Sequence, residues 1–180
     1  MTGCCRSTNT SKGRTAFRPA PPEGERDGFG GLAGEITRAG QTSYEQTAKI
    51  IEVELRHNKI GDALAVYLEA IHGEGSTAKE LPTGNGTSID VAVRGDGERV
   101  YYEIKTATSA QACIREALGQ LLEYSCWPGA TRADRLIVVG EAARDEKAKA
   151  YIECLRKDFR LPIEYRQFDM DNKRLVSCAL

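Results

Sequence analysis

The segment SIDVAVRGDGERVYYEIKT, residues 88–106, constrains the fold of this chain more than any other. Its two halves, 88–93 and 100–106, are rich in β-branched and aromatic residues, which favour β-strands. Asp96-Gly97 lies between the halves, and this dipeptide is a strong signal for a two-residue hairpin turn. The sequence therefore predicts two antiparallel strands joined by a tight turn.

The turn also determines which residues of the hairpin face each other. With a two-residue loop at 96–97, Asp90 falls opposite Glu103. Because side chains alternate along a strand, Tyr101, Glu103 and Lys105 share the face of Asp90. Directly opposed residues have Cβ atoms about 4.5–5.5 Å apart. The sequence thus predicts two adjacent carboxylates with an ammonium group two residues further on.

Two carboxylates this close repel each other by roughly 3 kcal/mol at an effective dielectric constant near 20. A divalent cation between Asp90 and Glu103 reverses the sign of that interaction. Mg²⁺ suits such a site, because it binds one or two carboxylates, keeps several waters and takes substrate phosphate oxygens as further ligands. Lys105 would then orient the attacking water or offset developing negative charge. The alternative is an exposed hairpin face with ordinary solvated charges, and spacing alone does not decide between the two.

Apolar periodicity predicts the other elements of the chain. Two helical stripes on either side of Arg56-His57-Asn58 come first, and a capping-box spacing at Thr108 and Gln111 predicts the start of a later helix. The expected order is a helix with apolar stripes over 43–55 and 60–71, strands over 78–81, 88–93 and 100–106, a helix from 108 to Trp127-Pro128-Gly129, a strand over 136–139, a helix over 142–159 and a strand over 162–166. This alternation predicts an α/β fold, a mixed sheet flanked by helices.

Residues 1–40 differ in composition from the rest of the chain. They hold eight of the 18 glycines and three of the six prolines. We expect a disordered or flexible leader over 1–40 and one domain over 41–180. No signal-peptide core and no run of roughly 18 apolar residues is present, so we expect a cytoplasmic protein without a membrane partner. The six cysteines lack C-x-x-C spacing, which favours free thiols.

Asp90, twelve intervening residues and then Glu103-Ile104-Lys105 resemble the D…(D/E)-x-K signature of the PD-(D/E)xK, or restriction-endonuclease-like, nuclease superfamily. The segment IREALGQLLEY, residues 114–124, is similar to the glutamine-bearing helix that follows this motif in many members. The resemblance covers roughly residues 43–170 and implies an αβββαβ restriction-endonuclease-like core.

The resemblance also implies an activity, that of a metal-dependent deoxyribonuclease hydrolysing DNA phosphodiester bonds in restriction, phage defence or repair. Asp90 and Glu103 would bind Mg²⁺, with Mn²⁺ as a possible substitute, and Lys105 would be the catalytic lysine. Gln120 would be a supporting polar residue near the metal or the substrate. A surface glutamine beside the apolar stripe is the alternative for Gln120.

Several positions depart from the family pattern or leave its roles open. Ile89, rather than proline, precedes Asp90, and the acidic residue that members often carry in the first helix is either Glu54 or Asp62. Arg56-His57-Asn58 resembles a motif of some bacterial proteins of this type. It makes His57 a candidate substrate contact or secondary base, and it makes Asn58 a candidate substrate contact.

Simpler interpretations exist for these positions as well. His57 would otherwise cap a helix or satisfy a neighbouring group. Arg115 is a candidate phosphate contact, or else an exposed helix arginine.

Charge and size suggest further alternatives. The formal net charge is -1, which by itself does not indicate nucleic-acid binding. A homodimer or a partner protein that completes a DNA cleft would reconcile this charge with a nuclease. A second hypothesis is a catalytically weak or inactive module of the same fold that binds nucleic acid or a partner protein. A third is a regulatory protein bound through the charged helix over 142–159.

Overall fold

The computed structural model describes residues 43–176, with side chains from residue 50 onward. The leader expected over 1–40 lies outside the described residues. The described residues belong to one compact unit, Gln41–Leu180. The elements are α1 (Ser43–His72), β1 (Thr77–Pro82), β2 (Ser88–Gly95), β3 (Glu98–Ile104), α2 (Ala110–Cys126), β4 (Arg135–Gly140), α3 (Glu146–Asp158), β5 (Ile163–Asp169) and β6 (Arg174–Leu175).

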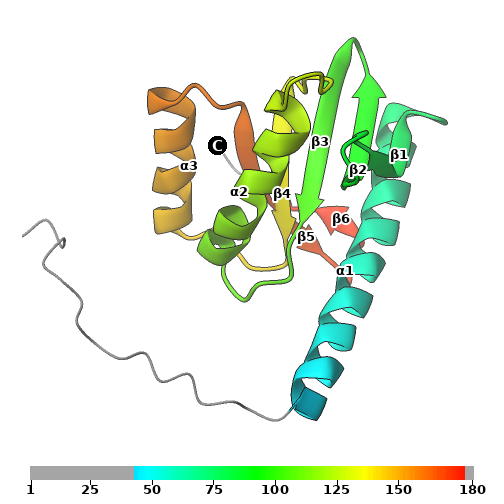
Figure 1. Ribbon diagram of the computed structural model, residues 1–180, viewed down its shortest axis with the longest axis vertical. Coiled ribbons are helices and arrows are strands. Elements are labelled where there is room, and N and C mark those ends of the chain that lie inside the picture. The colour runs from blue at the N-terminus through cyan, green and yellow to red at the C-terminus, as the bar shows by residue number, and fades with distance from the viewer. Residues whose placement is uncertain (1–42, 177–180) are drawn as a thin grey trace, which may run out of the picture. The chain divides into compact units, whose positions relative to one another are not determined.

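The strands form a mixed six-stranded sheet in the order β1-β2-β3-β4-β5-β6. Strand β2 pairs antiparallel with both β1 and β3, the strands β3, β4 and β5 are parallel, and β6 pairs antiparallel with β5. Helix α1 lies against one side of the sheet, and α2 and α3 lie against the other (Figure 1). The predicted α/β class, a mixed sheet flanked by helices, is confirmed.

Each face of the sheet has its own hydrophobic cluster. The α1 cluster joins Ile60, Leu64 and Leu68 of α1 to inward side chains of the strands. The α2 cluster lies on the opposite face, where apolar residues of α2 and α3 pack against strand side chains such as Tyr101 and Val138. These two clusters hold the β3–β4–β5 strands between layers of helix, as expected for parallel strands.

The hairpin between β2 and β3 follows the prediction. Asp96 has φ 53° and Gly97 has φ 81°, so both central residues lie in the left-handed region that a type I′ turn requires. Gly95 pairs with Glu98, as a two-residue loop demands. The predicted strand around 78–81 is also present as β1.

The two helical stripes belong to one continuous helix, α1, as the expected order has it, and residues 56–58 contain no proline or glycine to interrupt it. Two predictions of helix starts are wrong. The side chain of Ser109, rather than a Thr108–Gln111 capping box, caps α2 by accepting a hydrogen bond from the amide of Ala112. The third helix begins at Glu146, several residues later than predicted, because Asp145 caps it in the same way.

None of the helices in the described chain combines the length and the apolar character needed to cross a membrane. Cys113, Cys126 and Cys154 are free thiols, as the spacing of the cysteines indicated for this part of the chain. The short strand β6 was not predicted.

Candidate active site

The sheet opens between β2 and β3 where the acidic residues of the motif lie. Regular pairing of the two strands ends at Val91 and Tyr102, one pair short of Asp90 and Glu103. Beyond that point β2 continues to pair with β1, while β3 continues to pair with β4. In the opening, which we call the fork, the amide of Ile104 donates a hydrogen bond of 2.8 Å to Oδ2 of Asp90. A carboxylate therefore occupies the place where the strand ladder would have continued.

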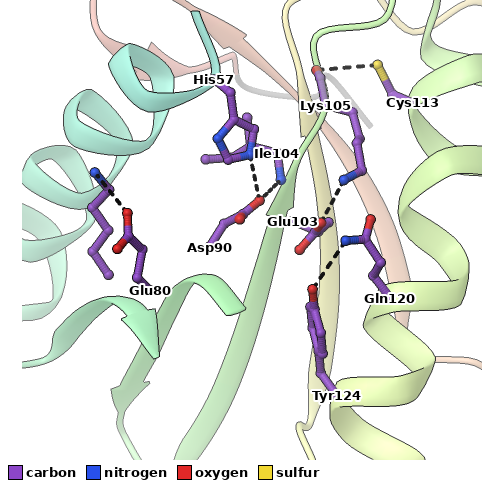
Figure 2. A network of polar contacts seen from close by, with 10 residues as sticks. His57, Glu80, Asp90, Glu103, Ile104, Lys105, Cys113, Gln120 and Tyr124 are labelled. Carbon is purple, nitrogen blue, oxygen red and sulfur yellow. Dashed lines mark hydrogen bonds and ion pairs between the residues drawn. The ribbon is translucent and has the colours of Figure 1, made fainter. Parts of the chain in front are cut away.

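Asp90 is also held from the α1 side of the sheet. Its Oδ2 atom lies 3.0 Å from Nε2 of His57, which α1 carries (Figure 2). The hydrogen bond with Asp90 raises the pKa of His57, although burial of the ring acts in the opposite direction. His57 sits inside α1 and caps no helix end. The structure thus brings His57 to Asp90, a contact that fits both the site candidate and the alternative in which His57 satisfies a neighbouring group.

Glu103 is almost completely buried, with only 1% of its surface exposed. Nζ of Lys105 lies 2.7 Å from Oε1 of Glu103. Oε2 of Glu103 is buried without a hydrogen-bond partner in the described structure. Burial, followed by the charge of Asp90, raises the pKa of Glu103 to about 7, and Lys105 acts against that rise. One oxygen of a buried carboxylate is thereby left for a ligand.

Helix α2 lines the Glu103 side of the fork (Figure 2). Nε2 of Gln120 donates to the hydroxyl of Tyr124 at 3.3 Å, one helical turn further on. Burial raises the pKa of Tyr124 to about 12, and the negative charges of Glu103 and Asp90 add to the effect. Tyr124 was not recognised as a site residue from the sequence, and its i+4 spacing from Gln120 is the signal that would have identified it.

Cys113, a second residue that the sequence did not single out, contacts the backbone of the segment that follows β3. Its Sγ lies 3.6 Å from the carbonyl oxygen of Lys105 (Figure 2). It also lies 3.5 Å from the carbonyl oxygen of Ala107. Gly140 makes room for it, because a Cβ there would lie only 2.8 Å from both Sγ and the hydroxyl of Tyr165. No pattern in the sequence distinguished this buried thiol from the other cysteines.

The other candidates make no hydrogen bond with Asp90 or Glu103 in the described part of the chain. Of the two possible first-helix acids, Glu54 is exposed, and Asp62 binds Nζ of Lys79 at 2.6 Å. Asn58 and Arg115 are both exposed, on α1 and α2. Their roles as substrate contacts remain predictions.

Asp90 and Glu103 are the residues of the fork that could hold a metal ion. Within the part of the chain that the structure describes, no group of three or more His, Cys, Asp or Glu side chains is arranged to hold a metal ion. Asp90 and Glu103 supply two interacting carboxylates, one of which has an unpartnered buried oxygen. Two carboxylates match the ligand set of Mg²⁺, which fills its remaining positions with water and phosphate oxygens.

Comparison with known proteins adds no relative. No protein-family model matches this chain, and no curated protein or solved structure is significantly similar to it.

Proposed function

We propose that this protein is a Mg²⁺-dependent nuclease that hydrolyses DNA phosphodiester bonds. The observation that carries the proposal is the fork, where the buried Glu103 keeps one oxygen without a partner beside Asp90 and Lys105. The order α1-β1-β2-β3-α2-β4 has the αβββαβ succession of a restriction-endonuclease-like core, which we propose as the finer description of the fold.

Asp90 and Glu103 would hold the metal ion. A buried acceptor without a hydrogen-bond partner costs about 1–3 kcal/mol, so an unpartnered Oε2 favours a ligand at that position. A bound Mg²⁺ or Mn²⁺ supplies two kinds of chemistry, a lowered pKa of bound water and stabilisation of negative charge on phosphate oxygens.

The side chains around the carboxylates have separate tasks. The ammonium group of Lys105 holds Oε1 of Glu103 and offers its remaining protons to a phosphate oxygen or to the attacking water. His57 and the Ile104 amide orient Asp90 by holding Oδ2 from two directions. Gln120 and Tyr124 border the site from α2, where Gln120 keeps one amide proton and its carbonyl oxygen for the substrate.

A cleavage assay tests the proposal. Single-stranded, double-stranded and branched DNA are incubated with the wild type, Asp90→Ala and Lys105→Ala, each with Mg²⁺ and with EDTA. We expect Mg²⁺-dependent cleavage by the wild type, and cleavage that is slower by about 100-fold or more in the two variants. Cleavage that persists in EDTA, or that is equal in all three proteins, would overturn the proposal. No cleavage of any of the three DNA forms by the folded wild type would also count against it.

A further inference from the structure

The ribbon formed by β1 and β2 has an irregularity at the level of the fork. The two strands pair in one register on both sides of Glu80, but Glu80 and Asp90, which that register places opposite each other, do not form a pair. Glu80 has φ 53°, in the left-handed region that residues with a side chain rarely adopt. The unusual backbone thus lies directly across the ribbon from the proposed metal ligand.

The two sides of this irregularity face different layers of the protein. Val91 packs in the α1 cluster, whereas Ile89 packs in the α2 cluster. Two residues apart on a regular strand share one face, so the alternation of β2 breaks at Asp90. Leu81, which follows Glu80 on β1, likewise packs against the α2 cluster. The part of the ribbon that holds Leu81 and Ile89 is therefore rotated relative to the part that holds Val91. Glu80 and Asp90 lie where the two parts meet.

The side chain of Glu80 has little part in this arrangement. It is 67% exposed, and its nearest charged partner is Nζ of Lys79 at 3.8 Å. That ammonium group makes its closer contact, 2.6 Å, with Asp62. Figure 2 shows Glu80 on the strand beside Asp90, on the far side of Asp90 from Glu103. What the position contributes is its backbone conformation.

We propose that the left-handed backbone at Glu80 is a kink that takes the backbone of Asp90 out of the strand ladder and brings its carboxylate onto the Ile104 amide. Glu80 is in this sense a positioning residue for the fork, through its φ angle and without its carboxylate. The consequence for catalysis rests on the proposed nuclease function, whereas the consequence for the Asp90–Ile104 contact does not.

Three substitutions distinguish the effect of the Glu80 backbone from that of its carboxylate. All three remove the carboxylate, and they differ in how readily the new residue adopts the left-handed region. Glu80→Gly and Glu80→Asn tolerate the left-handed region, and Glu80→Val disfavours it strongly because of its β-branch. Two quantities are measured on each full-length variant. The first is the rate of hydrogen exchange at the Ile104 amide, with the Tyr102 amide in the regular part of the ladder as control. The second is the rate of Mg²⁺-dependent DNA cleavage.

We expect Glu80→Gly and Glu80→Asn to exchange at Ile104 and to cleave DNA within about threefold of the wild type. We expect Glu80→Val to exchange more than tenfold faster at Ile104 with Tyr102 unchanged, and to cleave more than tenfold more slowly. Unchanged Ile104 exchange in Glu80→Val would overturn the proposal. Faster exchange in Glu80→Gly and Glu80→Asn as well would also overturn it, because the carboxylate would then be responsible.

Two further outcomes are assigned in advance. Should Glu80→Val not fold, Glu80→Ala replaces it, with Ile104 exchange faster than in Glu80→Asn if the kink matters and equal if it does not. Should the exchange pattern appear as expected while the wild type cleaves no DNA, the kink stands and the nuclease function fails.

Discussion

Two glutamates on the same sheet illustrate what distinguishes the fork from ordinary structure. Glu164 of β5 has both carboxylate oxygens occupied, Oε1 by Arg135 at 2.8 Å and Oε2 by Arg166 at 3.1 Å. Burial alone would raise the pKa of Glu164, but the hydrogen bonds and charges of the two arginines outweigh burial, and its pKa is lowered. Glu103 of β3 is more deeply buried, has one lysine, and its pKa is raised to about 7.

The difference lies in the number of partners. Glu164 is a satisfied carboxylate whose arginines complete its hydrogen bonds, and it has no need of a ligand. Glu103 remains one partner short, beside a second carboxylate that disfavours its ionisation. Functional sites often contain titratable groups whose pKa values are shifted by burial and by like charges. The following predictions test whether this contrast reflects function, from the largest expected effect to the smallest.

Removal of the lysine partner of Glu103 should have the largest effect. We expect Lys105→Ala to lower the single-turnover rate of DNA cleavage by about 10²–10³-fold, the loss typical of one preorganised electrostatic contact in an active site. Arg166→Ala, which removes a partner of Glu164, is the matched control and should change the rate less than threefold. Similar losses in the two variants, at unchanged circular dichroism, would remove the distinction between the two glutamates.

The contributions of Glu103 and Glu164 to the free energy of unfolding should change with pH in opposite directions. The pKa of Glu103 rises from 4.5 unfolded to about 7 folded, so the folded protein binds more protons in this range. Its contribution to the free energy of unfolding is therefore highest below pH 4.5 and falls as the pH rises to about 7, by an amount on the order of 3 kcal/mol. Glu103→Gln should lack this fall, so its stability relative to the metal-free wild type should increase between pH 5 and pH 8 in urea unfolding.

Glu164→Gln is the control for that measurement. The lowered pKa of Glu164 means that its stabilising contribution is present above pH 4.5 and is lost as the pH falls through the folded-state pKa. Glu164→Gln should therefore approach the stability of the wild type in acid, while Glu103→Gln approaches or exceeds it at neutral pH. Parallel curves for the two variants would show that the pKa values of the two glutamates are not shifted in opposite directions.

Metal binding should stabilise the wild type through the fork alone. At a Mg²⁺ or Mn²⁺ concentration of 100 times Kd, binding raises the free energy of unfolding by about 2.7 kcal/mol. We expect a corresponding rise in Tm for the wild type and for Glu164→Gln, and none for Asp90→Ala, by differential scanning fluorimetry. An equal rise in Asp90→Ala would place the metal elsewhere.

The sequence predicted those parts of the molecule that local signals determine. Asp96-Gly97 specified the turn and, through it, the register down to Val91. The end of the pairing at Asp90 was not predictable from the turn, because the side chain of Asp90 contacts His57 of α1, which lies 33 residues away in sequence. The strand alternation accordingly predicted an Asp90–Glu103 pair where the structure has a fork. Tertiary contact, rather than local propensity, determines the geometry of the fork.

The smallest expected effect concerns which residue of α1 orients Asp90. His57 contacts Oδ2 of Asp90 at 3.0 Å, but the Ile104 amide holds the same oxygen, so loss of the ring leaves Asp90 partly oriented. We therefore expect His57→Ala to slow cleavage by about tenfold, equivalent to about 1.4 kcal/mol of transition-state stabilisation. Asp62→Ala is the control on the same helix, since Asp62 is 69% exposed and bound to Lys79, and it should change the rate less than threefold. A larger loss in Asp62→Ala than in His57→Ala would assign the role to the acidic residue of the first helix, and the contact between His57 and Asp90 would then be structural only.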